Sequence, residues 1–392
     1  MDKKNFLNGL GRNIIILGLI SFFTDISSEM VFPLIPLYLI SIGSGAWVVG
    51  LVEGASETTA SLLKVFSGFF SDRFKKRKPF VFAGYSLSTI TKPLFAFANS
   101  WPFVLFIRVI ERIGKGVRTA PRDAIIAESC DPCVIGRGYG FHRAMDNIGA
   151  FFGASIAFIL FPIIGFKNIF LYAFIPGIIA VLCIFLIKEK INIDERKKSK
   201  PITLKIGLKK LPRNLKIFIF ISAIFTFGNF GYAFLMLKTK INYSYENAIL
   251  FYLIFLIIAA SFSIFSGILS DRIGRKPVII FGYIFFCLTC ILLIFSNTIY
   301  LILLGFILFG IFTAFIEGVQ KAFVVDLAPQ NLKATALGTF HTAIGLVALP
   351  SGFILGLIWD KISPEAMFIF ALFITIISII LFLFVKNIRI KS

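Results

Sequence analysis

The sequence is poor in charged residues, and poorest in acidic ones. Charged side chains make up 15% of the 392 residues, and 20 Asp and Glu stand against 40 Lys and Arg. The mean hydropathy is +0.91, and 49 residues are Phe. So little charge excludes an ordinary water-soluble domain, whose surface is rich in charged groups. The composition instead predicts a protein that is embedded in a membrane.

Recognisable enzyme and metal motifs are also missing. The sequence has no Walker loop, no deaminase signature, no zinc-ligand set and no Ser-His-Asp arrangement. Cys130 and Cys133 have the spacing of a CxxC pair, but neither a second pair nor a nearby His accompanies them. We therefore expect a protein that is not an enzyme and that binds no metal and no cofactor.

Apolar runs long enough to cross a membrane account for most of the chain. A span needs about 20 predominantly apolar residues. Backbone polar groups inside lipid must be satisfied within their own segment, so such runs are expected to be helices. The predicted fold class is an all-α membrane protein with twelve transmembrane helices, at residues 14–41, 47–71, 79–98, 102–127, 136–162, 168–187, 214–237, 247–270, 277–295, 299–327, 334–359 and 365–386.

The basic residues are distributed unevenly between the connections. An excess of Lys and Arg can indicate nucleic-acid binding, but here alternate connections are basic and the others are nearly uncharged. This alternation predicts a multi-pass protein of the inner (plasma) membrane with both termini and the middle loop in the cytoplasm. We expect the basic residues to contact membrane lipid and not nucleic acid, and the chain to be a monomer. The basic connections are residues 1–5, 73–78, 188–216, 272–276 and 386–392.

The chain contains an internal repeat. Residues 68–79 read GFFSDRFKKRKP and residues 267–277 read GILSDRIGRKP, so that Asp72 and Asp271 lie 199 residues apart. The dipeptide Phe-His at 141–142 recurs at 340–341, at the same separation. Two matches at one offset predict two six-helix bundles, at residues 1–187 and 214–392, joined by a cytoplasmic linker at 188–213. Large secondary transporters use parallel repeats of this kind.

The repeated stretch resembles the signature loop of the major facilitator superfamily. The first copy departs from the family pattern, because Lys75 occupies the place of a Gly. The residues of the signature are Gly68, Asp72 and Arg73 in the first copy, and Gly267, Asp271, Arg272, Gly274, Arg275 and Lys276 in the second. Pairs between these acids and the following bases are weak enough to form and break. We expect them to gate the transporter by holding its halves together in one state only. Charges that merely fix the topology are the plainer alternative.

Further motifs are similar to those of the same superfamily. Pro33-Leu-Ile-Pro36 and Arg108-x-x-Glu-x-x-Gly114 resemble its secondary motifs. Gly149-x-x-x-Gly153 is similar to the antiporter motif, but Ala154 replaces the expected Pro, which weakens the case for antiport. The resemblance is to a prokaryotic branch of uncertain substrate. It implies a transporter that works by alternating access, and it is nearly silent on the substrate.

One predicted helix is densely charged. At 100° per residue the charged side chains of residues 108–123 fall within an arc of about 140°, which predicts a stripe facing a water-filled cavity. The predicted members and their partners at similar depth are Arg108, Glu111, Arg112, Lys115, Arg118, Arg122 and Asp123, with Asp25, Glu29, Glu53, Glu57, Arg143, Asp146 and, from the second half, Asn229. Lys64 and Lys92 lie near helix ends, where we expect their amines to reach the membrane surface.

Two interpretations of this network differ in what it is for. Ion pairs that only hold helices together would be a poor solution, since buried pairs stabilise less than apolar packing does. At the offset of 199 the bases Arg108 and Arg112 become Ile307 and Ile311, so the second half manages without them. Ionisable groups inside a membrane usually serve function. We therefore expect a transport role.

The network supports two transport hypotheses. Asp25, Glu57 and Asp146 are candidates to carry a coupling proton, because exclusion of water favours the neutral form of a carboxyl group. The first hypothesis is therefore proton-coupled efflux of a small amphipathic drug or metabolite. Arg108, Arg112 and Arg143 could instead hold an anionic group, which suggests a transporter of organic phosphates or carboxylates. A membrane sensor without transport is the third possibility, and the weakest.

Overall fold

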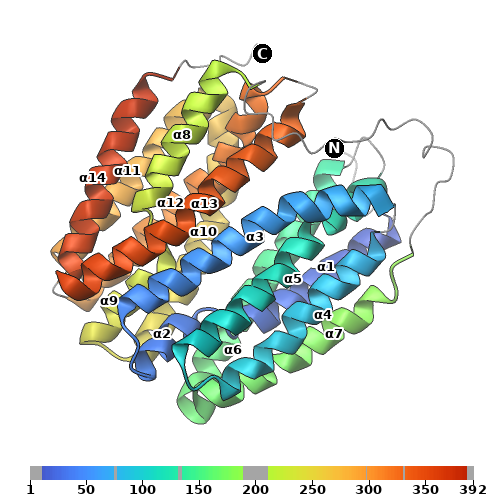
Figure 1. The fold of residues 1–392 in the computed structure, drawn as a ribbon, viewed down its shortest axis with the longest axis horizontal. Helices are drawn as coiled ribbons and strands as arrows, with labels where there is room; N and C mark the ends of the chain where they lie inside the picture. Colours follow the sequence, from blue (N-terminus) through green and yellow to red (C-terminus); the bar gives the residue numbers. More distant parts are fainter. Residues whose placement is uncertain are drawn as a thin grey trace, which may run out of the picture. The chain divides into compact units, whose positions relative to one another are not determined.

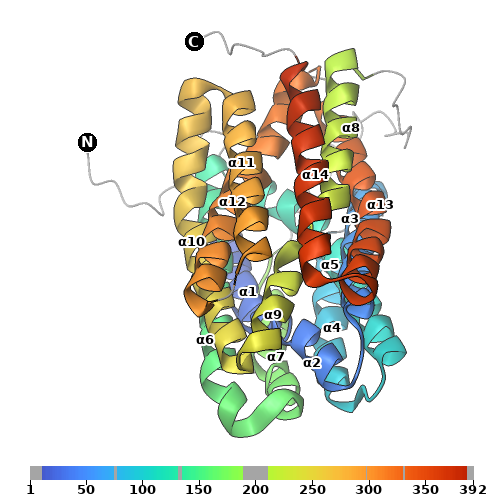
Figure 2. The same ribbon diagram turned by 90° about the vertical axis from the view of Figure 1, so that its left-hand side faces the viewer.

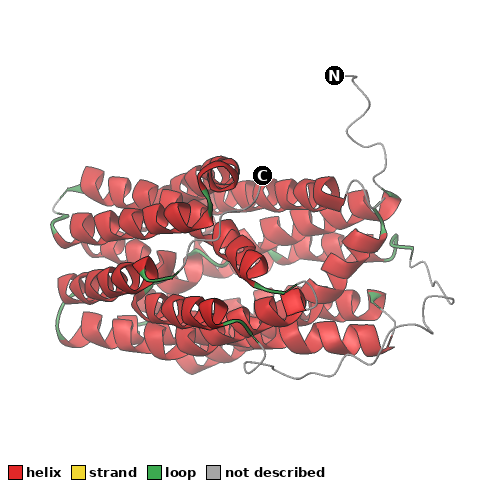
Figure 3. Cartoon of the chain, turned by 90° about the horizontal axis from the view of Figure 1, so that it is seen from above, coloured by secondary structure: helices red, strands yellow, loops and turns green. Residues whose placement is uncertain are grey.

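The computed structural model of the chain describes residues 11–74, 77–130, 135–188, 211–296, 298–329 and 332–385. Within these residues every regular element is helical (Figure 3). The helices, which Figure 1 labels, are α1 Arg12–Glu29, α2 Leu34–Ser41, α3 Ala46–Phe74, α4 Lys78–Leu94, the 3₁₀ turn η1 Phe95–Phe97, α5 Trp101–Glu128, α6 Ile135–Tyr172, α7 Phe174–Ile184, α8 Arg213–Gly228, α9 Gly231–Asn242, α10 Tyr245–Ile273, α11 Arg275–Ile294, α12 Ile299–Leu327, α13 Lys333–Lys361 and α14 Pro364–Leu383.

Two of the predicted helices are interrupted. The run at 14–41 forms α1 and α2 with a turn between them, and Pro33, which cannot donate a backbone hydrogen bond, precedes α2. The run at 214–237 forms α8 and α9, which are separated at Asn229 and Phe230. Gly231 begins α9 with a φ of 64°, a conformation that suits glycine. Each of these two runs is nevertheless long and apolar enough to cross a membrane as a whole, at Arg12–Ser41 and Arg213–Asn242.

Eight segments of the described chain are long and apolar enough to cross a membrane. The segment Arg137–Ile184 covers two predicted spans, which Gly165 separates with its non-helical φ of 68°. The helices α3 and α5 carry many charged residues, and α4 has 17 residues, so these three are less apolar or shorter than the eight segments. Much of the charge of α5 belongs to the candidate site.

Contacts divide the chain into two compact units, described separately here. Unit 1 comprises Met1–Phe32, Thr59–Ala98 and Phe106–Lys205, and in it α1 packs on α6 and α7 while α4 packs on α7. Unit 2 comprises Pro33–Thr58, Asn99–Leu105 and Ile206–Ser392. Within it α11 packs on α12 and α14, and α8 packs on α13 and α14 (Figure 2). The predicted bundles at 1–187 and 214–392 remain a prediction from the repeat.

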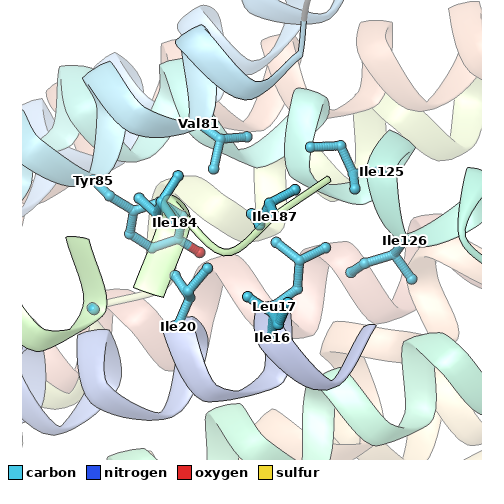
Figure 4. Packing of buried hydrophobic residues seen from close by; sticks show 10 residues of the cluster. Ile16, Leu17, Ile20, Val81, Tyr85, Ile125, Ile126, Ile184 and Ile187 are labelled. Atoms are coloured by element: carbon cyan, nitrogen blue, oxygen red, sulfur yellow. The ribbon is translucent and has the colours of Figure 1, made fainter. Parts of the chain in front are cut away.

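The core at one end of unit 1 is aliphatic. Figure 4 shows its labelled side chains packed close together. Close packing of this kind is what holds helices together inside a membrane, where hydrophobic burial offers little advantage. The cluster consists of Ile16, Leu17 and Ile20 of α1, Val81 and Tyr85 of α4, Ile125 and Ile126 of α5, and Ala180, Ile184 and Ile187 beside and within α7.

The core of unit 2 is aromatic. The ring of Phe225 stacks on that of Tyr283, with centroids 4.2 Å apart, and Phe286 and Phe312 pack around them. Aromatic pairs contribute roughly 0.5–1.5 kcal/mol beyond the area they bury. Unit 2 thus holds these helices together with aromatic rings.

Candidate functional site

The charged stripe of α5 lies largely inside unit 1. Arg108 and Glu111 have no exposed surface, Arg112 is 9% exposed and Arg118 is 5% exposed. The expectation that the whole stripe faces a water-filled cavity is therefore wrong for its deep end. Lys115, Arg122 and Asp123 retain partial exposure.

Glu111 lies between two guanidinium groups. Its Oε2 is 3.3 Å from NH1 of Arg108 and 3.5 Å from Nε of Arg112. Both guanidinium groups also lie over the ring of Phe32, with their carbons 4.0 and 4.9 Å from its centroid. The face of an aromatic ring attracts a cation. The carboxylate of Glu111 and the ring of Phe32 thus each contact both buried guanidinium groups.

Glycines bring α4 against the charged face of α5. A Cβ at Gly84 would lie 2.6 Å from the carbonyl oxygen of Gly114, and a Cβ at Gly114 would lie 2.6 Å from that of Gly84. At this close approach Arg118 donates a hydrogen bond of 2.6 Å to Oγ of Ser88 and lies 4.3 Å above the ring of Tyr85. The packing of small residues therefore fixes the position of a charged one.

A second cluster surrounds Asp146 on α6. Ser21 of α1 donates a hydrogen bond to Oδ1 of Asp146, and Nδ1 of His142 lies 3.6 Å from the same oxygen. Arg143 lies 3.9 Å from Oδ2, but its side chain is 65% exposed. The charged groups that act on Asp25 of α1 include Asp146 and Lys115. Asp25 thereby connects the α6 cluster with the α5 stripe.

The Gly-x-x-x-Gly motif of α6 explains why α1 comes so close. A Cβ at Gly149 would lie 2.4 Å from the carbonyl oxygen of Phe22, and one at Gly153 would lie 2.5 Å from that of Ile26. The two backbones therefore touch, which small residues at this spacing allow. In unit 1 the motif sets the distance between α1 and the acid of α6.

The remaining predicted site residues are distributed over both units. Glu29 of α1 is partly buried in unit 1 and acts electrostatically on Asp25. Glu53 is partly buried and Glu57 exposed, both on the part of α3 that belongs to unit 2. Asn229 ends α8, and its Oδ1 accepts a hydrogen bond of 3.4 Å from the backbone N–H of Gly231. The structure thus brings together Asp25, Glu29, Arg108, Glu111, Arg112, Lys115 and Asp146 in unit 1.

Lys92 does not lie where its position near a helix end predicts. We expected its amine at the membrane surface, but the side chain has no exposed surface. Its Nζ donates a hydrogen bond of 2.7 Å to Oγ of Ser27. Helical spacing in the sequence could have indicated this burial. Lys92 follows Ser88 by four residues and so shares the face of α4 that meets α5.

The second signature loop has a defined structure. Gly274 joins α10 to α11 with a φ of 93°, which explains the glycine at this place in the motif. Arg275 pairs with Asp271 at 2.5 Å and with Asp326 of α12 at 3.3 Å. Lys276 donates hydrogen bonds to the carbonyl oxygens of Leu383 and Val385, at 2.8 and 2.6 Å.

The first copy makes equivalent contacts. Arg77 pairs with Glu128 at 2.7 Å, and Lys78 donates to the carbonyl oxygens of Phe185 and Ile187, at 3.1 and 2.8 Å. The side chains of Gly68, Asp72 and Arg73, in the last turns of α3, lie outside the described residues, as does Lys75. Each of these described contacts lies within one unit, so the gating role remains a prediction.

These contacts correct the register of the repeat. Arg77 and Glu128 correspond to Arg275 and Asp326 at an offset of 198, one residue less than we used. The packing agrees, because a Cβ at Gly84 would meet Arg118 and one at Gly282 would meet Ile316. The counterparts of Arg108 and Arg112 are therefore Phe306 and Gly310. With either offset, the second half of the chain has no charged residue at the positions that correspond to Arg108 and Arg112.

No metal site is found among the described residues, where no group of three or more His, Cys, Asp or Glu is suitably placed. Cys130 is a partly buried free thiol. Cys133, the other cysteine of the CxxC pair, lies outside the described residues.

An all-helical chain with several membrane-spanning segments and a buried charged network is an integral, multi-pass membrane protein. Its sequence matches the Major Facilitator Superfamily over residues 17–259 and 217–391. The chain belongs to this superfamily and is a transporter rather than an enzyme. The predicted family and fold class are thereby confirmed.

Three known proteins illustrate the similarity. An uncharacterized MFS-type transporter of Methanocaldococcus jannaschii is 41% identical over 385 residues, which cover 96% of this chain and 95% of that protein. The fosmidomycin resistance protein of Escherichia coli is 24% identical over 93% of this chain and 91% of its own. The crystal structure of a mutant of the nucleoside transporter NupG has a TM-score of 0.80 at 16% identity and covers 95% of this chain and 99% of that one.

Proposed function

We propose that this transporter works by alternating access and couples the export of a small amphipathic drug or metabolite to the movement of protons. The buried charged network of unit 1 is the observation that carries this proposal. A transporter without a nucleotide site must draw its energy from a gradient or from the substrate. Ionisable groups held inside a membrane are the usual means of coupling to protons.

Asp25 and Asp146 are the preferred carriers of the coupling proton. They lie on α1 and α6, whose backbones meet at Gly149 and Gly153, and their charges act on one another. Two neighbouring acids can hold one proton between them and release it when the helices move. Glu57, exposed in unit 2, stays a third candidate.

Similarity to a known protein supports a role in drug resistance. The fosmidomycin resistance protein is a relative over most of the chain. Its name indicates a role in resistance to that compound. We further propose that the protein is a monomer of the inner membrane with both termini in the cytoplasm, that its basic loops contact lipid, and that the signature loops act as gates.

Transport of an organic anion is the second candidate. Arg108 and Arg112 both contact the carboxylate of Glu111, in a group of side chains that is almost entirely buried. Arg143 adds an exposed guanidinium near Asp146. Guanidinium groups bind carboxylates and phosphates through paired hydrogen bonds. On this alternative the arginines bind the anionic group of the substrate. The neighbouring acids then act as counter-ions of the arginines.

A ligand-stabilisation screen separates the two candidates. The purified protein is heated with ethidium, benzoate or inorganic phosphate at about pH 5.5 and about pH 7.5, two values either side of the range where coupling groups titrate. We expect ethidium to raise the unfolding temperature by different amounts at the two pH values. We also expect Asp25→Asn with Asp146→Asn to remove the difference. Stabilisation by benzoate or phosphate that is equal at both pH values would favour the anion transporter without proton coupling.

A further inference from the structure

An apolar groove lies between α4 and α7 of unit 1. The two helices pack side by side (Figure 1), and the groove that both of them line has a volume of about 130 Å³. A cavity of about 150 Å³ is large enough for a benzene molecule, so this groove has room for a few carbon atoms. Its lining includes Ser86, Thr89 and Ile90 of α4 and Ile178, Val181 and Leu182 of α7.

The side chains on both sides of the groove are apolar and exposed. Ile90 is 57% exposed on the α4 side, and Leu182 is 58% exposed on the α7 side. In an integral membrane protein, exposed aliphatic side chains of this kind meet the acyl chains of lipid, which are as apolar as leucine. The groove is therefore open to a lipid chain.

A close contact holds α4 and α7 together beside the groove. The hydroxyl of Thr89 donates a hydrogen bond of 3.4 Å to the carbonyl oxygen of Gly177. A Cβ at Gly177 would lie 2.7 Å from Cγ2 of Thr89, so the glycine is what lets the helices approach. The groove is thus bounded by two helices whose spacing is fixed.

Ser86 contributes to the groove by its small size. Its hydroxyl oxygen is buried and has no hydrogen-bond partner among the described residues, so it makes no structural hydrogen bond there. The second copy of the repeat differs at this place. Ser86 follows Lys78 by eight residues, and eight residues after Lys276 the chain has Ile284, which is 42% exposed. A large apolar side chain thus occupies in α11 the position that a serine leaves open in α4.

An apolar surface leads from the groove to the start of α4. Lys78, Phe82, Ser86 and Ile90 follow one another at intervals of four residues and so lie along one side of the helix. Phe82 is 37% exposed, and its ring packs on that of Phe185 with centroids 5.4 Å apart. The path from the groove to Lys78 is therefore covered by aromatic rings.

Three basic residues gather at that end of unit 1, and we call Arg12, Lys78 and Lys188 the basic end. Nζ of Lys78 donates to two carbonyl oxygens just beyond α7, next to Lys188. The side chain of Asn13 bonds both the backbone N–H and the carbonyl oxygen of Lys188, at 3.1 and 2.7 Å, which brings in the neighbouring Arg12. Arg12 and Lys188 are exposed. Basic residues at a membrane surface attract anionic lipids.

The groove lies within reach of a lipid whose headgroup is at the basic end. The eight residues from Lys78 to Ser86 span about 12 Å along α4, at about 1.5 Å per residue. Half of the bilayer core is about 15 Å thick. An acyl chain that starts near Lys78 therefore passes the groove before it reaches the middle of the membrane.

We propose that the groove between α4 and α7 binds one acyl chain of an anionic phospholipid whose headgroup lies at the basic end. Burial of apolar surface gives little advantage inside a membrane, so the fit of the chain beside Ser86 and the charge of the basic end provide the selectivity. The inference rests on the proposed contact between the basic loops and lipid, to which it gives a defined site. It does not depend on the proposed proton coupling.

Photo-crosslinking locates the lipid. The full-length protein is placed in liposomes with a small amount of phosphatidylglycerol that carries a diazirine in one acyl chain, and the labelled peptides are identified by mass spectrometry. We expect label on Ile90, Ile178 or Leu182, and we expect unlabelled phosphatidylglycerol to compete better than phosphatidylcholine. Equal labelling of these residues by a phosphatidylcholine with the same diazirine chain would overturn the proposal, because the basic end would then play no part.

Substitutions test the groove and the basic end separately. Ser86→Ile gives α4 the residue of the second copy, so we expect the label to fall several-fold. Ser86→Ala keeps the groove open, and Ser261→Ile changes an exposed serine of α10, so both should be labelled like the wild type. We expect Lys188→Gln to weaken labelling about fivefold, which corresponds to about 1 kcal/mol for each basic residue near an anionic surface. Equal labelling of Ser86→Ile and Ser261→Ile would refute the groove.

Native mass spectrometry of the purified protein distinguishes this inference from the proposed function. It measures how much phosphatidylglycerol and how much phosphatidylcholine stay bound after extraction from liposomes that contain both. We expect phosphatidylglycerol to be retained preferentially. If the protein retains the two lipids equally, the proposed contact between the basic loops and anionic lipid fails together with the groove. If phosphatidylglycerol is retained but the groove is not labelled, the groove alone is refuted.

Discussion

Glu111 shows how charge is kept inside this protein. Its carboxylate contacts two guanidinium groups, and the ring of Phe32 covers both of them. Removing one member of a buried pair leaves an uncompensated charge, which costs much more than the pair itself contributes to stability. The residues of the network are therefore interdependent, and single substitutions test them sharply.

The substitution Glu111→Gln removes the negative charge while keeping the size of the side chain. Because Arg108 and Arg112 then lose the carboxylate that both of them contact, we expect the free energy of unfolding to fall by about 3–5 kcal/mol. Unfolding of the purified protein measures this loss. Asp271→Asn is the control, since that acid is 66% exposed and a surface pair contributes about 0–1 kcal/mol. Equal losses in the two variants would show that Glu111 does not neutralise the arginines.

The sequence predicted which residues of unit 1 carry charge, but not their surroundings. The helical spacing of α5 correctly placed Arg108, Glu111 and Arg112 on one face. Their burial depends on Phe32, Gly84 and other residues far away in the chain. Lys92 was misplaced for the same reason, because its partner Ser27 lies on another helix, 65 residues away. Contacts between distant segments cannot be read from local periodicity.

At the scale of helices, the length of each membrane-spanning helix could be predicted from the sequence, because the thickness of the bilayer core sets it. A run of about 20 apolar residues is sufficient evidence for a helix across a membrane. The breaks were less evident, although Pro33 and Gly231 mark two of them. The repeat register was wrong by one residue in part of the chain, because the first signature loop is one residue longer than the second. The paired contacts of Arg77 and Arg275 reveal this shift of register.

Within unit 2, Asp360 of α13 caps the start of α3. Its two carboxylate oxygens accept hydrogen bonds from the backbone N–H groups of Ala46 and Trp47, at 3.0 and 2.8 Å. The first N–H groups of a helix lack partners of their own, and a negative charge is favourable there. The helices touch farther along, where a Cβ at Gly50 would lie 1.9 Å from the carbonyl oxygen of Gly352.

We expect Asp360→Ala to lower the free energy of unfolding by about 0.5–2 kcal/mol, the usual cost of losing a helix cap. Asp360→Asn is the matched comparison: it keeps one oxygen acceptor but sets an amide NH₂ against the second backbone N–H, so we expect it to retain only part of the stabilisation. Thermal unfolding of both variants is the measurement. If the two substitutions are equally harmful, the negative charge and not the cap is what stabilises the contact.

At the scale of the whole molecule, the two halves of the repeat have diverged in chemistry. Unit 1 has the buried cluster of Glu111 and its arginines, whereas the corresponding positions of α12 are apolar or glycine. Both copies of the signature loop nevertheless keep the same contacts to the ends of neighbouring helices. The shared contacts support a common role in the transport cycle, and the unshared charge supports a specific role for unit 1.

The proposed gating role predicts an effect on rate rather than on stability. Asp271 is exposed and pairs with Arg275, which also pairs with Asp326. We expect Asp271→Asn to slow transport into liposomes while its unfolding temperature stays close to that of the wild type, because exposed pairs contribute little to stability. Transport at the wild-type rate would mean that the loop only fixes the topology.

Proton-driven transport through unit 1 is the central claim, and uphill movement tests it most directly. Liposomes that contain the protein are given a pH gradient and no other energy source, and the accumulation of ethidium is followed over time. The account predicts accumulation against the concentration gradient that ends when a protonophore collapses the pH difference, and that is lost in Asp25→Asn with Asp146→Asn. Transport that only equilibrates the compound, at the same rate with and without the pH gradient, would contradict the account.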